Sequence, residues 1–103
     1  MNILHLTLKK QWFEKILHGQ KNQEYRALTH YWQARLMHPD GTMKQYDYVR
    51  FRNGYARNAP TMDVDFIVTQ IGYPNREWCE KGSASRQCFI IQLGQIQNTK
   101  NIK

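Results

Sequence analysis

Three charged side chains, Lys21, Glu24 and Arg26, form the part of this chain best suited to chemistry. They belong to the octapeptide Gly-Gln-Lys-Asn-Gln-Glu-Tyr-Arg at residues 19–26. Side chains two apart on a strand point to one face, so Glu24 and Arg26 are expected to face the same way, with Asn22 beside them. There, Lys21 can donate a hydrogen bond or act as a base, Glu24 can accept or move a proton, and Arg26 can hold a carbonyl, carboxylate or phosphate. The same spacing also fits an exposed ion-pair cluster, which would contribute little.

The residues before this cluster predict the element that positions it. Residues 10–18 change to a helical period, with apolar side chains on one stripe at Trp12, Phe13, Ile16 and Leu17. Gly19 follows directly and suits the left-handed position that ends a helix. We therefore expect a short amphipathic helix, a turn that carries Lys21, and then a strand over residues 22–26.

Alternating apolar and polar runs predict the rest of the fold. A second helix is expected over residues 30–36, capped by Thr29, and Trp12, Phe13 and Trp32 are assigned to the core. The chain is predicted to be an α+β, mainly β domain, a small β-barrel of five or six strands with one or two short helices. At 103 residues it is expected to form one domain over residues 1–103, with its core in residues 3–96 and a frayed tail at 97–103. The expected strands are residues 3–8, 22–26, 46–52, 61–71 and 88–93.

A second basic group follows the middle of the chain. Arg50 and Arg52 share a strand face, Asn53 begins a tight Asn-Gly turn, and Tyr55 and Arg57 come after it. Basic side chains interleaved with an aromatic ring suit phosphate contacts and base stacking. The pattern fits equally well a solvated edge strand that is kept basic to prevent edge-to-edge pairing.

Metal and cofactor chemistry is not expected. The four histidines show no ligand spacing, and the chain has no glycine-rich phosphate loop. Asp63 and Asp65 share a strand face, which is read as solvated in preference to a divalent-ion site or an acid pair. Cys79 and Cys88 lack metal or redox spacing and are expected to be reduced thiols.

The charge of the chain favours a polyanionic partner. Lys and Arg number 15 against 8 acidic residues, which gives a net charge of +7. Nucleic acid is therefore preferred to a membrane surface, and no apolar stretch approaches the ~20 residues of a membrane span. The start of the chain lacks the features of a signal peptide, so a cytoplasmic location is expected. The sequence does not define an oligomeric state.

The pattern Gly-x-Lys-x-x-Glu-x-Arg, formed here by Gly19, Lys21, Glu24 and Arg26, resembles the signature of the ASCH domain family. The resemblance implies a PUA-like β-barrel whose cleft, lined by the lysine, glutamate and arginine, binds RNA or a nucleotide or modified nucleoside. It covers about residues 3–96. Further segments that resemble the family's elements are residues 4–8, 12–18, 49–55 and 88–93.

The resemblance also implies an alternative function as a hydrolase. Some ASCH proteins remove the acetyl group from N(4)-acetylcytidine, and others are metal-dependent ribonucleases. The amidohydrolases carry a threonine nucleophile where this chain has Glu24, and a carboxylate cannot serve as that alkoxide. Lys21 and Glu24 would instead form a proton-transfer pair that activates water. Glu77 and Glu80 are the candidates for the distal glutamate of those enzymes, and a regulatory protein with an acidic protein partner is a third possible class.

Overall fold

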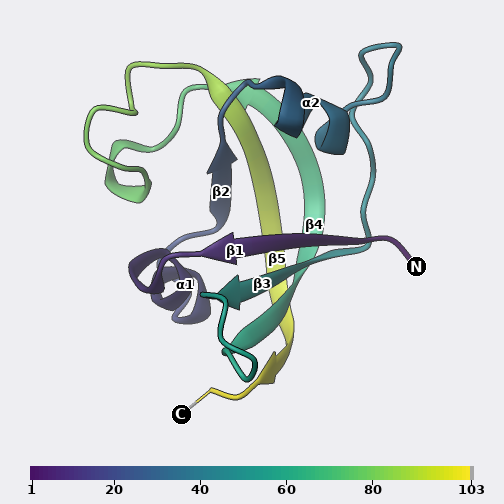
Figure 1. The fold of residues 1–103 in the computed structure, drawn as a ribbon. Coiled ribbons are helices and arrows are strands. Elements are labelled where there is room, and N and C mark those ends of the chain that lie inside the picture. The colour runs from purple at the N-terminus through teal and green to yellow at the C-terminus, as the bar shows by residue number, and fades with distance from the viewer. Residues whose placement is uncertain (103) are drawn as a thin grey trace.

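The computed structural model describes residues 1–102 and contains one curved five-stranded sheet with short helices beside it (Figure 1). The strand order is β1-β3-β4-β5-β2, in which only the β1–β3 pair is parallel. The elements in chain order are β1 (Ile3–Leu8), α1 (Lys10–Leu17), β2 (Gln23–Arg26), α2 (His30–Leu36), β3 (Tyr48–Asn53), β4 (Thr61–Gly72), the short 3-10 helix η1 (Arg76–Trp78) and β5 (Cys88–Lys100).

The predicted α+β, mainly β class is confirmed, with five strands and two short α-helices. The barrel is not closed. β1 and β2 stand at the two edges of the sheet, and no ladder joins them within residues 1–102. Side chains of the candidate site, described below, lie between these two edges.

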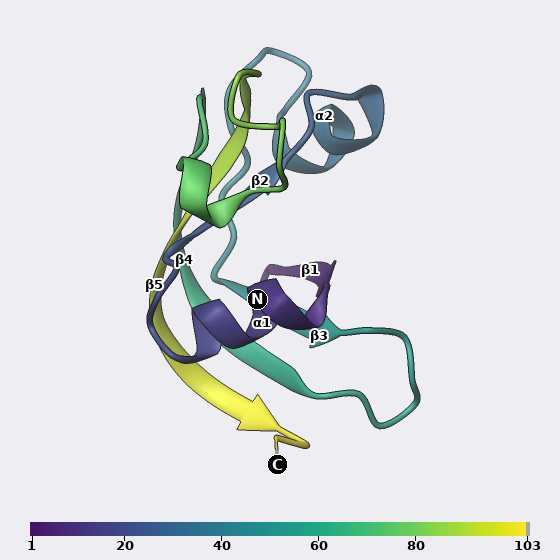
Figure 2. The same cartoon turned by 90° about the vertical axis from the view of Figure 1, so that its left-hand side faces the viewer.

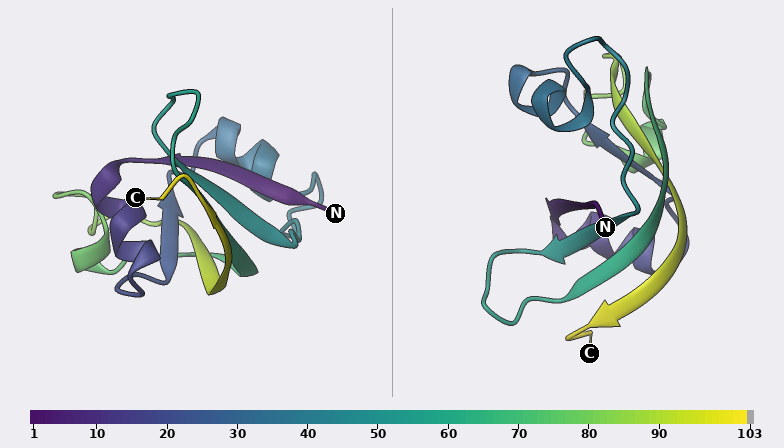
Figure 3. Two further views of the ribbon diagram at one scale, coloured as in Figure 1. Left: turned by 90° about the horizontal axis from the view of Figure 1, so that it is seen from below. Right: turned by 90° about the vertical axis from the view of Figure 1, so that its right-hand side faces the viewer.

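The apolar core lies on the concave side of the sheet. Figure 2 shows β4 and β5 bent along their length, with α1 inside the curve, and Figure 3 shows the same curvature from two further directions. The buried side chains follow the spacing that the sequence predicts for apolar residues. Alternate residues of β1 are buried, and α1 buries Phe13 and Ile16. Burying such side chains supplies most of the favourable free energy of folding. The remaining members of this core are Leu4, Leu6, Leu8, Leu36, Val49, Phe51, Met62, Val64, Phe66, Phe89, Ile91 and Leu93.

Irregular pairing between β4 and β5 accompanies the bend. Their register shifts three times, between Asp63 and Phe66 and again before Val68. Gly94 lies against this stretch, where a Cβ atom would come within 2.9 Å of the Asp65 Cβ. Bulges increase the local twist of a strand, and glycine permits a close backbone approach. The bend brings the two edges of the sheet toward each other.

The end of the chain corrects one prediction. The tail at residues 97–103 was expected to be frayed, but β5 continues to Lys100 and pairs with β4 as far as Thr61. The reason is long-range, because the 12-residue β4 offers a partner along its whole length. Position 103 lies outside the described residues. None of the helices in residues 1–102 has the length and apolar character needed to cross a membrane.

Candidate functional site

A pocket of about 560 Å³ lies at the seam between the two edges of the sheet. The end of β1 forms one side, β2 forms another, and residues of α1 and of the 73–87 loop complete the wall. The Arg26 side chain spans the seam, because its Nη2 donates to the backbone oxygen of Thr7 at 3.1 Å. The place where the sheet fails to close is therefore the place where the predicted charged residues gather.

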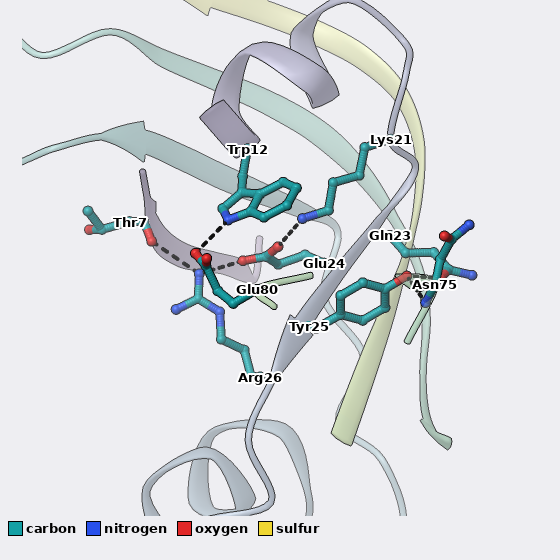
Figure 4. Close-up of polar contacts among 9 residues, drawn as sticks. All are labelled: Thr7, Trp12, Lys21, Gln23, Glu24, Tyr25, Arg26, Asn75 and Glu80. Carbon is teal, nitrogen blue, oxygen red and sulfur yellow. Dashed lines mark hydrogen bonds and ion pairs between the residues drawn. The ribbon is translucent and has the colours of Figure 1, made fainter. Parts of the chain in front are cut away.

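Glu24 holds this cluster together (Figure 4). Its Oε1 accepts from Lys21 Nζ at 3.0 Å, and its Oε2 accepts from Arg26 Nη2 at 2.7 Å. The side chains of Lys21 and Glu24 are 1% and 7% exposed. The predicted convergence of the three residues is thus confirmed, and the alternative of a solvent-exposed ion-pair cluster is wrong for Lys21 and Glu24. Asn22 is exposed and does not line the pocket.

Lys21 is placed by the end of α1. Gly19 has a φ of 74°, the left-handed conformation that the sequence predicts, and the backbone amides of Gln20 and Lys21 both donate to the Lys15 oxygen. This turn directs the lysine inward. Its Nζ lies 4.4 Å from the centre of the Trp12 ring, an arrangement that favours a cation in a partly dry site.

Arg26 has one buried donor without an acceptor among the described residues. Its guanidinium lies 4.8 Å from the centre of the Trp32 ring, which fixes the plane of the group. Nη2 serves Glu24 and Thr7, whereas Nε is buried without a hydrogen-bond partner among residues 1–102. A buried donor without an acceptor carries a free-energy cost.

A second carboxylate reaches the pocket from the 73–87 loop. Glu80 Oε1 accepts from Trp12 Nε1 and from Lys9 Nζ, each at 3.1 Å. The Trp12 hydrogen bond and then the Lys9 hydrogen bond lower the pKa of the Glu80 carboxyl. Of the two glutamates considered from the sequence, Glu80 lines the pocket and Glu77 does not.

The pocket also contains a hydroxyl and a thiol whose pKa values are raised. Burial raises the pKa of the Tyr25 hydroxyl, which donates to Gln23 Oε1 at 2.5 Å. Burial likewise raises the pKa of the Cys88 thiol, so this residue is a poor nucleophile at neutral pH. Cys79 and Cys88 both line the pocket and are free thiols, as predicted.

The second basic group lies elsewhere. Arg50 and Arg52 line a separate hollow of about 440 Å³ that shares no residue with the first pocket, and Asn53 and Tyr55 line neither. Tyr55 is 87% exposed. The two predicted groups therefore do not converge, because Arg50 and Arg52 lie on the face of β3 opposite the core residues.

One aspartate of β4 also differs from expectation. Asp63 was assigned to a solvated face, but it is buried and accepts from Arg50 Nε at 2.7 Å and from Nη2 at 3.1 Å. Asp65 is partly exposed and accepts from Gln97. A buried carboxylate requires such a partner, and the arginine directly across the ladder supplies it. Within residues 1–102 no group of histidine, cysteine and acidic side chains is arranged to hold a metal ion.

Two aromatic walls of the pocket were not anticipated. Trp12 was assigned to the core, yet it is only partly buried and faces the pocket beside Lys21. Its indole N–H needs an acceptor, which favours a position at the border of a core. Trp78 lies in a polar loop, and no periodic signal in the sequence placed it here. Trp32, also assigned to the core, is partly buried against it.

Comparisons with protein-family models, with curated proteins and with solved structures found no match to this chain. The roles of the pocket residues are therefore argued from their geometry.

Proposed function

We propose that the protein is an ASCH-like binding module that holds a base of RNA, or a nucleotide or modified nucleoside, in the pocket at the seam of the sheet. The observation that carries this proposal is the buried carboxylate of Glu24 between two cationic donors, next to the Trp12 ring. Cys79 and Cys88 are free thiols, which suit a reducing compartment, so we propose that the protein is cytoplasmic.

The pocket offers both kinds of contact that single bases require. Unpaired bases are held by stacking on aromatic rings and by hydrogen bonds to their edges. Trp12, Tyr25 and Trp78 supply ring surfaces, while Glu24 and Arg26 supply an acceptor and a donor side by side. A volume of about 560 Å³ falls within the range of small-molecule sites.

The charge of the pocket suits an anionic or neutral ligand. Lys9, Lys21, Arg26 and Arg86 line it against two carboxylates, Glu24 and Glu80. Glu24 already pairs with Lys21 and Arg26. Arg86 is exposed and is free of that cluster, so it can donate to a phosphate or sugar oxygen of the ligand. A nucleotide therefore fits this pocket better than an apolar ligand.

A hydrolase acting on an acylated nucleoside is a second candidate, favoured by the position of Glu80. This carboxylate enters the same pocket as the Lys21–Glu24 pair and is held by Trp12 and Lys9. A second carboxylate beside a lysine can orient or deprotonate water. The hydrogen bonds of Glu24 argue against the hydrolase. Both of its carboxylate oxygens already accept from cationic side chains, which favours a role in ligand recognition over proton transfer.

One experiment separates the two functions. The protein is incubated with a panel of ribonucleosides, N(4)-acetylcytidine and short RNAs, and native mass spectrometry records retained ligand and released product. Retention without product supports the binding module, and deacetylated product supports the hydrolase. If the wild type retains none of the probes and yields no product, the assignment of this pocket is wrong.

Matched variants locate the effect in the pocket. Glu24→Gln should reduce ligand retention about tenfold or more through loss of a charged acceptor, whereas Glu77→Gln, an exposed glutamate of the neighbouring loop, should leave it unchanged. Arg26→Lys keeps the charge but loses the planar fork and should also weaken binding. Circular dichroism confirms that each variant is folded. Equal losses in Glu24→Gln and Glu77→Gln would exclude specific recognition by Glu24.

A further inference from the structure

A second charged hollow lies on the outer face of the sheet, outside the pocket described above. It has a volume of about 440 Å³ and is formed by β3, the loop after it, the start of β4 and the end of β5. Four cationic side chains and one carboxylate line it: Arg50, Arg52, Arg57, Lys100 and Asp63.

The pairing of the strands orders these residues into two rows. Arg52 is the register partner of Thr61, and Thr61 is the partner of Lys100, so the three side chains emerge in line from one face. In the next row, Arg50 pairs with Asp63 across the same ladder. Because strands lie about 4.8 Å apart, the Cα atoms of Arg52 and Lys100 are about 10 Å apart, close enough for both long side chains to reach an anion above Thr61.

The rows differ in how their charges are compensated. Arg50 forms a two-point ion pair with Asp63, so its charge is balanced locally. Arg52 instead donates from Nε to the Gly54 oxygen at 3.1 Å and from Nη2 to the Ala56 oxygen. These acceptors are neutral, so they fix the orientation of the guanidinium without cancelling its charge. A cation held in this way is preorganised for an external anion.

Two further cations remain open toward the same hollow. Arg57 and Lys100 are exposed, and within residues 1–102 neither has a carboxylate inside 4.0 Å. The Thr61 hydroxyl lies between the cations as a neutral donor. These donors suit a tetrahedral oxyanion: the oriented guanidinium of Arg52, the uncompensated cations of Arg57 and Lys100, and the hydroxyl of Thr61.

We propose that the row Arg52–Thr61–Lys100, together with Arg57, binds a phosphate group. This site is separate from the base-binding pocket, but the two adjoin at one point, since Thr7 of the pocket is the register partner of Arg52. The phosphate can therefore be free or can belong to the backbone of a nucleic acid strand. The experiment below distinguishes these two sources.

The test is an NMR titration that follows the backbone amides of Thr61 and Lys100 and the Arg52 Nε–H signal. The probes are inorganic phosphate and a single-stranded oligouridine of about ten nucleotides. Sodium chloride at matched ionic strength corrects for screening. Saturable shifts with inorganic phosphate indicate a general phosphate site, and shifts with the oligonucleotide alone indicate a backbone site. No saturable shift with either probe would overturn the proposal.

A charge-matched pair of variants completes the test. Arg57→Ala/Lys100→Ala removes two cations of the site, and Lys10→Ala/Arg76→Ala removes two that line neither pocket. The first double variant should lower the slope of log affinity for oligouridine against log salt by up to about two units, and the second should leave it unchanged. Equal effects would show that affinity follows net charge alone and would also overturn the proposal. Retention of free nucleosides in the seam pocket is measured separately, so failure of one site does not obscure the other.

Discussion

At the scale of single residues, Glu24 determines the character of the seam. Its carboxylate is buried and is compensated by Lys21 on one oxygen and by Arg26 on the other. Removing one partner of a buried ion pair leaves an uncompensated charge, whereas replacing the whole pair can be nearly neutral. The contribution of this cluster to the free energy of unfolding therefore requires all three side chains, and it cannot be divided among them.

Lys21→Met should lower the free energy of unfolding by about 3 kcal/mol, because Arg26 alone then compensates the buried carboxylate. Urea denaturation measures the change. Lys10→Met, which removes an exposed lysine at the start of α1, should stay within about 0.5 kcal/mol of the wild type.

The double variant Lys21→Met/Glu24→Gln should be less destabilised than the sum of the two single variants. Additive losses would show that Lys21 and Glu24 do not interact, contrary to the 3.0 Å contact between Nζ and Oε1.

This cluster could be predicted from the sequence because its cause is local. Glu24 and Arg26 are two apart on a strand, and Gly19 ends the helix so that Lys21 turns toward them. By contrast, Glu80 reaches Trp12 across a separation of 68 residues, and no local pattern encodes that contact. The separation of Arg50 and Arg52 from the pocket likewise depends on which face of the sheet each residue of β3 occupies.

At the scale of elements, the 73–87 loop is tied to the pocket by Glu80. The hydrogen bonds from Trp12 and Lys9 lower the pKa of its carboxyl below the ordinary value of 4.5. A group with a lowered pKa in the folded state stabilises the contact above its ordinary pKa, and this contribution is lost as the pH falls through the lowered value. The loop should therefore be held at neutral pH and released in acid.

Acid release of the loop can be followed through the Trp12 indole N–H signal. In the wild type this signal should move as the pH falls below 4.5, since the protonated carboxyl loses its attraction for Lys9 and weakens as an acceptor. Glu80→Gln should abolish the transition, and Glu77→Gln should retain it. A transition that persists in Glu80→Gln would assign it to another group.

The bend between β4 and β5 has its own test. Gly94→Ala should lower the free energy of unfolding by about 1–3 kcal/mol, because the new Cβ would meet the Asp65 Cβ at 2.9 Å. Gly72→Ala is the matched control, since its Cβ would meet only the end of the Ile90 side chain at 3.3 Å. Thermal unfolding compares the two, and equal stability would show that the close approach at Gly94 does not constrain the sheet.

The elements themselves were largely predictable, and their partners were not. The periods of the apolar residues placed five strands and two helices near their observed bounds. The parallel pairing of β1 with β3, and the extension of β5 along β4 to Lys100, arise from contacts between distant segments. These long-range pairings set the strand order, and the strand order places β1 and β2 at the edges of the sheet. The open seam between them could therefore not be derived from local patterns.

At the scale of the whole molecule, the sheet curves enough to bring its edges together without joining them. The seam contains the buried ion-pair cluster, the aromatic walls and a side-chain bridge from Arg26 to Thr7. The second hollow lies on the other side of β3, so the cationic side chains of the two hollows belong to separate surfaces. We propose that the seam recognises a base and that the outer face binds phosphate.

If the seam pocket is the ligand site, the indole N–H signals of Trp12 and Trp78 report on ligand binding directly. Both tryptophans line the pocket from different elements. A nucleoside or short RNA retained by the protein is titrated into labelled protein while these two NMR signals are recorded. Both signals should shift along one saturation curve, Glu24→Gln should move that curve to about tenfold or more higher ligand concentration, and Glu77→Gln should leave it unchanged. Binding of the same ligand with both indole signals unmoved would contradict this assignment of the ligand site.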